Sequence, residues 1–200
     1  YKHFLTGVAL TATLFASAAG ADDVDRSKPP APKPAPKVML PEIQKATLAN
    51  GLHVWLVEHH ELPTVAMNLV INAGSDHDPL AKPGLASMTA DVLDEGTKTR
   101  NALQISEEIE SIGASFGTSS GWDGSFMTLN TLTKHLAKGL EIFADVLTNP
   151  TFPEKDFERL RRQLITSLLQ QRDQPVTIAN NAFSFVLYGS SHPYGNNPSG

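Results

Sequence analysis

The order of strand-like and helix-like segments from residue 45 to residue 187 constrains the fold of this chain more than any other feature. Asn50-Gly51 separates two short apolar runs. Both turn residues tolerate positive φ, so the pattern predicts a β-hairpin with arms near 45–49 and 52–58. The next run, 64–74, is apolar almost throughout, which is typical of a strand in the middle of its sheet.

Helical periodicity begins after Gly84. It predicts one helix from Leu85 to Asp94, and Gly96 stops it. Asn101 is expected to cap a second helix. The same patterns predict strands at 114–120 and 124–132 and helices over 136–147, 153–168 and 176–187. This order favours the α+β class, with two layers: a mainly antiparallel sheet covered by helices on one face. We expect the sheet to be incomplete at its C-terminal end.

The first 38 residues have the composition of a targeting segment followed by a linker. Residues 1–21 combine Lys2, an apolar run and an A-x-A triplet at 19–21, which predicts a secretory signal peptide. A membrane anchor is the alternative. Residues 22–38 alternate Pro, Ala and Lys, which predicts an extended linker, so the folded domain is expected to cover 39–200. We expect an exported protein, in the periplasm or alternatively outside the cell, with no membrane span after signal cleavage.

Composition and charge exclude several classes of protein. The formal net charge is -5, and the longest basic cluster is the short run ERLRR at 158–162, which is typical of a solvated helix face. No basic face for nucleic acid is therefore expected. The chain has no cysteine, which excludes disulfides, thiolate metal sites and a cysteine nucleophile.

Two other kinds of motif do not predict a site. GASFG and GTSSG place Ser115 and Ser119 in the pattern G-x-S-x-G. A hydrolase nucleophile needs a strand before the serine and a helix after it, whereas here a helix precedes and a strand follows. His59 and His60 are adjacent, and adjacent residues of a strand point to opposite faces, so surface positions are expected for them and not a shared metal ion. His77 lies in the acidic segment 76–78, for which a solvated turn is expected.

Residues 84–97 read GLASMTADVLDEGT. A zinc peptidase helix needs two histidines four residues apart, since that spacing puts both imidazoles on one face, and a glutamate to polarise the zinc-bound water. The stretch resembles the insulinase-like zinc metallopeptidases (the pitrilysin or M16 family), whose helix reads G-L-A-H-x-x-E-H-x-x-x-x-G-T. The residues that match this frame without a gap are Gly84, Leu85, Ala86, Gly96 and Thr97. The resemblance covers about residues 42–198 and implies an M16-like domain.

The positions that carry the family's chemistry differ in this chain. Ser87 and Asp91 stand where the family has its two histidines, and Ala90 stands in place of the glutamate. The family's third ligand, a glutamate, falls on or near Ser167, and no glutamate follows Glu158. The resemblance therefore implies no catalytic residue, no metal ligand and no cofactor in this chain.

Some bacterial members of the family work as pairs in which one subunit has lost the zinc helix. The resemblance implies that this chain is such a non-catalytic subunit, which pairs with a homologous zinc-bearing subunit to bind and degrade peptides. The substrate-binding Arg and Tyr of such subunits would fall beyond Gly200. Two alternatives stay open: a structural scaffold without peptide handling, or an active enzyme with an unrecognised site.

Overall fold

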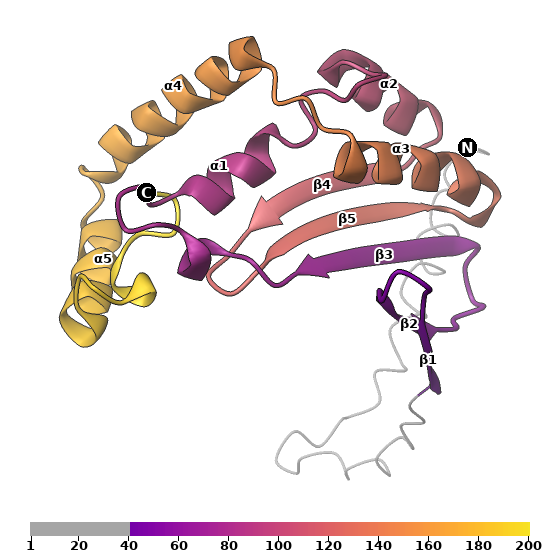
Figure 1. The fold of residues 1–200 in the computed structure, drawn as a ribbon, viewed down its shortest axis with the longest axis horizontal. Helices are drawn as coiled ribbons and strands as arrows, with labels where there is room; N and C mark the ends of the chain where they lie inside the picture. Colours follow the sequence, from indigo (N-terminus) through magenta and orange to yellow (C-terminus); the bar gives the residue numbers. More distant parts are fainter. Residues whose placement is uncertain (1–40) are drawn as a thin grey trace, which may run out of the picture. The chain divides into compact units, whose positions relative to one another are not determined.

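The computed structural model describes residues 41–200. The predicted signal peptide (1–21) and linker (22–38) lie outside these residues, and the domain boundary at 39 stays a prediction. The chain divides into two compact units, with the boundary between Glu58 and His59. Figure 1 shows both units.

The described part of the first unit is the predicted hairpin. Strand β1 (Ile43–Thr47) pairs antiparallel with β2 (His53–Val57), with Lys45 opposite Trp55. The turn lies at Asn50-Gly51, where Gly51 has a φ of 87°. The Asn50 side chain accepts a hydrogen bond from the Leu52 amide at 3.1 Å. These local interactions confirm the hairpin, although its arms begin and end one or two residues from the predicted bounds.

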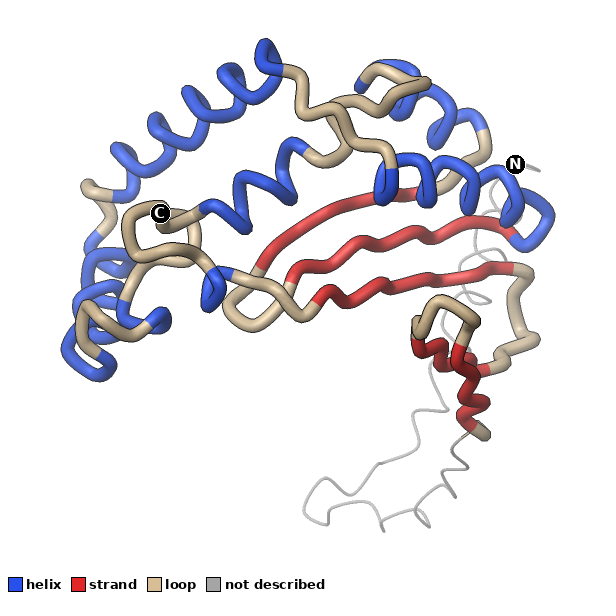
Figure 2. Tube along the Cα trace, viewed as in Figure 1, coloured by secondary structure: helices blue, strands red, loops and turns tan. Residues whose placement is uncertain are grey.

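The second unit contains its strands and helices in the predicted order, and Figure 2 shows the strands in red and the helices in blue. Strand β3 is followed by α1 and α2, the strand pair β4 and β5, and then three helices. Their bounds are β3 (Thr64–Ile71), α1 (Leu85–Val92), α2 (Ala102–Ser111), β4 (Ser115–Ser120), β5 (Ser125–Leu132), α3 (Leu136–Thr148), α4 (Glu154–Gln171) and α5 (Pro175–Tyr188).

The sheet of the second unit has the strand order β3-β5-β4, and both pairings are antiparallel. The central strand is therefore β5, whose Met127 and Leu129 are completely buried. The expectation that 64–74 is the central strand is wrong for this sheet, since β3 lies at its edge. Half-buried and exposed residues alternate along β3, and none of its residues is fully buried, whereas β5, between two strands, carries three fully buried positions.

Helices α1 to α4 lie on one side of this sheet (Figure 1). The core forms where α2 and α3 pack on β5, and it consists of Ile105, Ile109, Met127, Leu129, Ile142, Phe143 and Val146. The two-layer α+β fold, with an antiparallel sheet covered on one face, is thus confirmed. Among the residues described, none of the helices has the length and apolar character needed to cross a membrane.

One ion-pair network joins the loop after α1 to α2 and α3. The side chain of Arg100 is only 12% exposed. Its guanidinium donates to Asp145 at 2.7 Å, to Glu108 at 3.2 Å and also to Glu141. Asp145 accepts further hydrogen bonds from the hydroxyls of two threonines in the same loop, at 2.7 Å each. The network fixes the chain just after α1 relative to the helix layer.

This network makes the stability of the fold dependent on pH. Burial alone would raise the pKa of Asp145, but hydrogen bonds from Thr97, Thr99 and Arg100 hold that pKa well below its ordinary value. A carboxylate with a lowered folded pKa stabilises the fold fully above its unfolded pKa, about 4, and loses that effect as the pH falls. We expect Asp145→Asn to lower the free energy of unfolding most above about pH 5. Urea unfolding at pH 7, 5, 4 and 3 measures the difference in the free energy of unfolding between Asp145→Asn and wild type. This difference should become smaller as the pH falls, and a difference that does not change with pH would contradict the prediction.

Candidate functional site

Helix α1 carries three of the four positions that sequence analysis singled out, and an aspartate before the helix fixes its start. The carboxylate of Asp78 accepts hydrogen bonds from the amides of Gly84, at 2.8 Å, and Ala86, at 2.9 Å. Gly84 has a φ of 85°, a left-handed conformation that favours glycine. The expectation of a solvated turn at 76–78 is therefore wrong for Asp78. His77 fits it better, since its side chain is 57% exposed and its ring nitrogen lies 2.7 Å from the carboxylate of the neighbouring Asp76.

The role of Asp78 leads to a stability prediction. Asp78→Ala leaves two amides at the start of α1 without their charged acceptor, and we expect a loss of about 2 kcal/mol in the free energy of unfolding. Asp173→Ala is the matched control, because Asp173 is an exposed aspartate in the turn after α4. It should change stability by less than about 0.5 kcal/mol. Equal effects of the two variants in urea unfolding would refute the anchoring role.

The degenerate positions lie where α1 crosses the sheet. Ala90 is 6% exposed, and its carbonyl accepts a hydrogen bond from the Thr118 hydroxyl of β4 at 2.8 Å. Ser87 is half-buried and Asp91 lies at the surface, one turn apart on one helix face. Partial burial raises the pKa of the Asp91 carboxyl. Ser167 is exposed on α4, and its hydroxyl accepts a weak hydrogen bond from Gln171 at 3.5 Å.

Helices α1 and α4 contact each other, so the fold brings together the two elements that carry these positions. Their side chains nevertheless do not fit a zinc ion. Zinc in proteins binds imidazole, thiolate or carboxylate ligands, usually three or four together, whereas this set offers one carboxylate and two hydroxyls. Across residues 41–200, no group of three or more His, Asp and Glu side chains is placed to hold a metal ion.

The remaining sequence motifs have no catalytic geometry in the described residues. Ser115 and Ser119 both lie on β4, after helix α2, so the strand–serine–helix context of a hydrolase is missing, as expected. His59 and His60 follow β2, which ends at Val57. Both are exposed, so the expectation of surface positions is confirmed.

The segment after α5 packs against the tip of the β4–β5 hairpin, a contact that no local sequence pattern predicts. Tyr194, in a short 3-10 helix (Pro193–Gly195), contacts the ring of Trp122 edge-on at 5.2 Å between centroids. Its hydroxyl donates to Asp123 at the tip of the β4–β5 hairpin. Tyr188 and His192 complete the aromatic cluster. The closely spaced aromatic residues from Tyr188 to Tyr194 are the only sequence signal that indicates this cluster.

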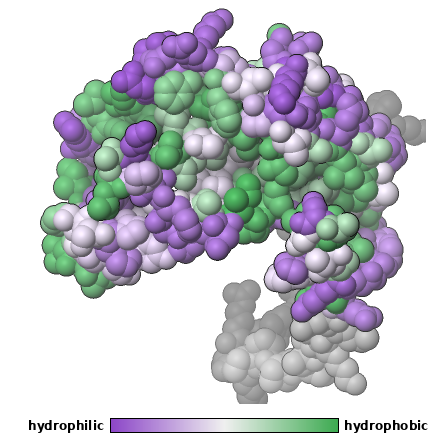
Figure 3. Space-filling view, in the orientation of Figure 1, coloured by the Kyte–Doolittle hydropathy of each residue, from purple (hydrophilic) through white to green (hydrophobic). Residues whose placement is uncertain are grey.

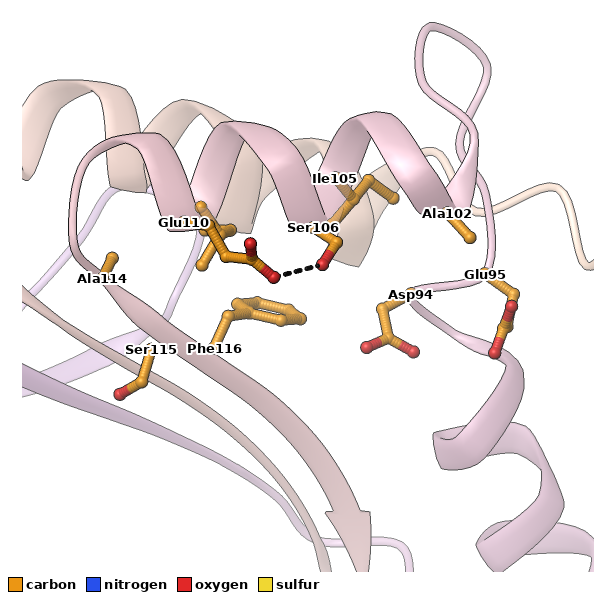
Figure 4. A pocket seen from close by; sticks show the side chains of 10 residues that line it. Asp94, Glu95, Ala102, Ile105, Ser106, Glu110, Ala114, Ser115 and Phe116 are labelled. Carbon is orange, nitrogen blue, oxygen red and sulfur yellow. Dashed lines mark hydrogen bonds between the residues drawn. The ribbon is translucent and has the colours of Figure 1, made fainter.

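Sequence analysis also missed a cavity of about 350 Å³ beside the start of β4. It lies between the end of α1, helix α2 and Phe116 of β4, as Figure 4 shows. The carboxylates of Asp94, Glu95 and Glu110 line it together with apolar side chains. These residues are distant in sequence, so no local pattern indicates the cavity.

Comparisons with known proteins agree with this fold. The family model of the insulinases (peptidase family M16) matches residues 53–188. The β subunit of mitochondrial-processing peptidase from Rattus norvegicus is 32% identical over 67% of this chain and 28% of its own length. Subunit 1 of the mitochondrial cytochrome b-c1 complex from Bos taurus is 30% identical, over 67% of this chain and 28% of that protein. This chain therefore spans less than a third of either relative.

A solved structure is also similar. The inactive domain of an M16 peptidase from Pseudomonas fluorescens superimposes with a TM-score of 0.75 and is 32% identical. The match covers 79% of this chain and 38% of that one.

Proposed function

The chain belongs to the insulinase family of peptidases (family M16), and from this premise we propose that it is a non-catalytic subunit that pairs with a homologous zinc-bearing subunit to bind and degrade peptides. The proposal rests on one observation: α1 keeps its place in the fold but has lost the side chains that bind zinc. The helix keeps its frame, with Asp78 anchoring its start and Thr118 bonded to Ala90. Its ligand positions, Ser87 and Asp91, cannot hold the metal that the family's chemistry needs.

The role of such a subunit is to hold an extended peptide. Strand β4 pairs with β5 on one side, and within residues 41–200 no strand pairs with its other side. Helix α1 packs beside β4. A peptide that adds to this edge gains main-chain hydrogen bonds regardless of its sequence, and side-chain pockets then supply specificity. We therefore place the peptide along the free edge of β4.

Exposed apolar surface supports the pairing part of the proposal. Figure 3 shows apolar residues at the surface over α5, at the left of the view. The exposed apolar side chains of this helix are Val176, Ile178, Phe183, Phe185, Val186, Leu187 and Tyr188. Apolar patches of this kind mark contacts with further protein. The rat and bovine relatives are both named as subunits. Export rests on the signal-like residues 1–21 and is likewise a proposal.

A peptide-cleavage assay tests the proposal. The full-length protein alone should cleave no peptide, and the zinc-bearing homologue alone should cleave slowly or not at all. Mixing the two should give cleavage that a chelator abolishes. A variant of the homologue that lacks its metal ligands serves as the control, because it should leave the mixture inactive. Chelator-sensitive cleavage by this chain alone would refute the proposal.

A structural subunit without peptide handling is the second candidate, and the similarity to a subunit of the bovine cytochrome b-c1 complex favours it. The two candidates differ in what the assembled pair binds. A complex that forms but neither binds nor cleaves any extended peptide would establish the structural role in place of the peptidase role.

A further inference from the structure

The cavity beside β4 combines an apolar floor with an acidic rim. Ile105 and Ile109 of α2 contribute the floor and are 4% and 6% exposed, and the ring of Phe116 lies below α2 (Figure 4). The carboxylates of Asp94 and Glu110 reach the same space from the end of α1 and from α2. A ligand that fills this space needs an aliphatic or planar stem and a positively charged end.

The negative charge of the rim is only partly balanced. Glu95 pairs with Arg159 at 2.6 Å, and Glu110 accepts a hydrogen bond from Ser106 at 3.0 Å. No ion pair within residues 41–200 reaches Asp94 or Glu110, and none of the residues lining the cavity is basic. Burial raises the pKa of Asp94, and the charges of Glu95 and of the Asp91 carboxylate raise it further. A bound cation would relieve this repulsion.

The cavity lies where a peptide on the β4 edge would place a side chain. Phe116 points to the helix layer, since its ring packs edge-on against Phe143 of α3. Two residues along, Thr118 points the same way and bonds to Ala90 of α1. A peptide strand paired beside β4 also directs every second side chain to the helix layer. The peptide side chain that lies beside Phe116 therefore faces the cavity. The peptide side chain two residues along, beside Thr118, faces α1.

We propose that this cavity is a subsite for the Lys or Arg side chain of an extended peptide that lies along β4. The stem of that side chain packs on Phe116 and the two isoleucines, and its charged end meets Asp94 and Glu110. A cavity of about 350 Å³ falls at the small end of ligand pockets and suits one side chain. The proposal rests on the proposed peptide-binding function and adds a preference for peptides with a basic residue at this position.

Peptide binding to the full-length protein tests the subsite. The probes are fluorescent peptides of about ten residues, mainly Ala and Thr, with one central Lys, Arg, norleucine or Glu. Binding is measured by fluorescence anisotropy. We expect the Lys and Arg peptides to bind at least about tenfold more tightly than the norleucine peptide, because they gain a charge-assisted contact. Asp94→Asn and Glu110→Gln should each remove most of this preference for the Lys and Arg peptides.

Glu107→Gln is the matched control, since it removes the same charge from the exposed side of α2 outside the cavity. It should leave every affinity unchanged. Peptides with N-methylated backbones report on edge pairing itself and should bind weakly. If the norleucine peptide binds as tightly as the Lys peptide while N-methylation still weakens binding, the subsite is refuted and edge binding stands. If no peptide binds, both the subsite and the peptide-binding function are refuted. Equal effects of Asp94→Asn and Glu107→Gln would also overturn the subsite.

Discussion

A chain that carries Ser87→His, Asp91→His and Ser167→Glu should bind zinc at least about a thousandfold more tightly than the unchanged chain. This corresponds to about 4 kcal/mol, a fraction of the 10–16 kcal/mol of a complete structural zinc site. The physical reason is that α1 keeps its geometry. Residues four apart on a helix share a face, and α4, which would carry the third ligand, contacts α1. Equilibrium dialysis with metal analysis measures the effect.

The control for this experiment separates geometry from ligand number. Thr89→His with Asp91→His and Ser167→Glu adds the same side chains, but residues two apart on a helix do not face each other. Both Thr89 and Asp91 are exposed, so the substitutions should be tolerated equally. We expect this variant to bind zinc little better than wild type. A folded graft that binds no more zinc than the control would show that α1 and α4 no longer hold the family's geometry.

Removal of the Arg100 side chain should be the most destabilising single change in the described residues outside the core. Arg100→Met leaves the carboxylates of Glu108, Glu141 and Asp145 close together without the guanidinium that joins them. Within this network Arg100 and Asp145 are only 12% and 10% exposed, and removing one partner of a buried ion pair costs about 3 kcal/mol or more. The free energy of unfolding in urea measures the loss.

Arg161→Met is the matched control. Arg161 is 53% exposed, and among residues 41–200 its one ion pair is with Glu158, three residues away on α4. Exposed pairs of this kind contribute little, so its loss should change stability by less than about 0.5 kcal/mol. If Arg100→Met is equally mild, the network does not fix the segment after α1 to the helix layer. That outcome would remove the structural basis for the position of Asp94 and Glu95.

Sequence patterns predicted those elements whose signals are local. Asn101 caps α2 as expected, because its side chain and that of Gln104 exchange hydrogen bonds with each other's backbone amides. Asn50-Gly51 forms the turn of the first hairpin as expected, because this residue pair is also a local signal. The neighbours of β3 could not be predicted, because strand order depends on tertiary pairing. A continuous apolar run such as 64–74 does not distinguish an edge strand from a central one.

The candidate site was predicted in its chemistry but not in its surroundings. The substitutions at Ser87, Ala90 and Asp91 are visible in the sequence once the frame from Gly84 to Thr97 is aligned. The anchoring role of Asp78 was not, since its bonds to the amides of α1 span a loop with no standard capping spacing. The cavity could not be predicted either, because its walls come from the turn after α1, from α2 and from the start of β4, which meet only in the folded chain.

Native mass spectrometry of the co-purified pair counts chains and metal ions together, so it determines which subunit holds the zinc. We expect one copy of this chain, one copy of the zinc-bearing homologue and one zinc ion. After dissociation, the zinc should remain with the homologue, and this chain should carry none. A zinc ion retained by this chain alone, or a purified chain that forms no complex with any zinc-bearing homologue, would contradict it.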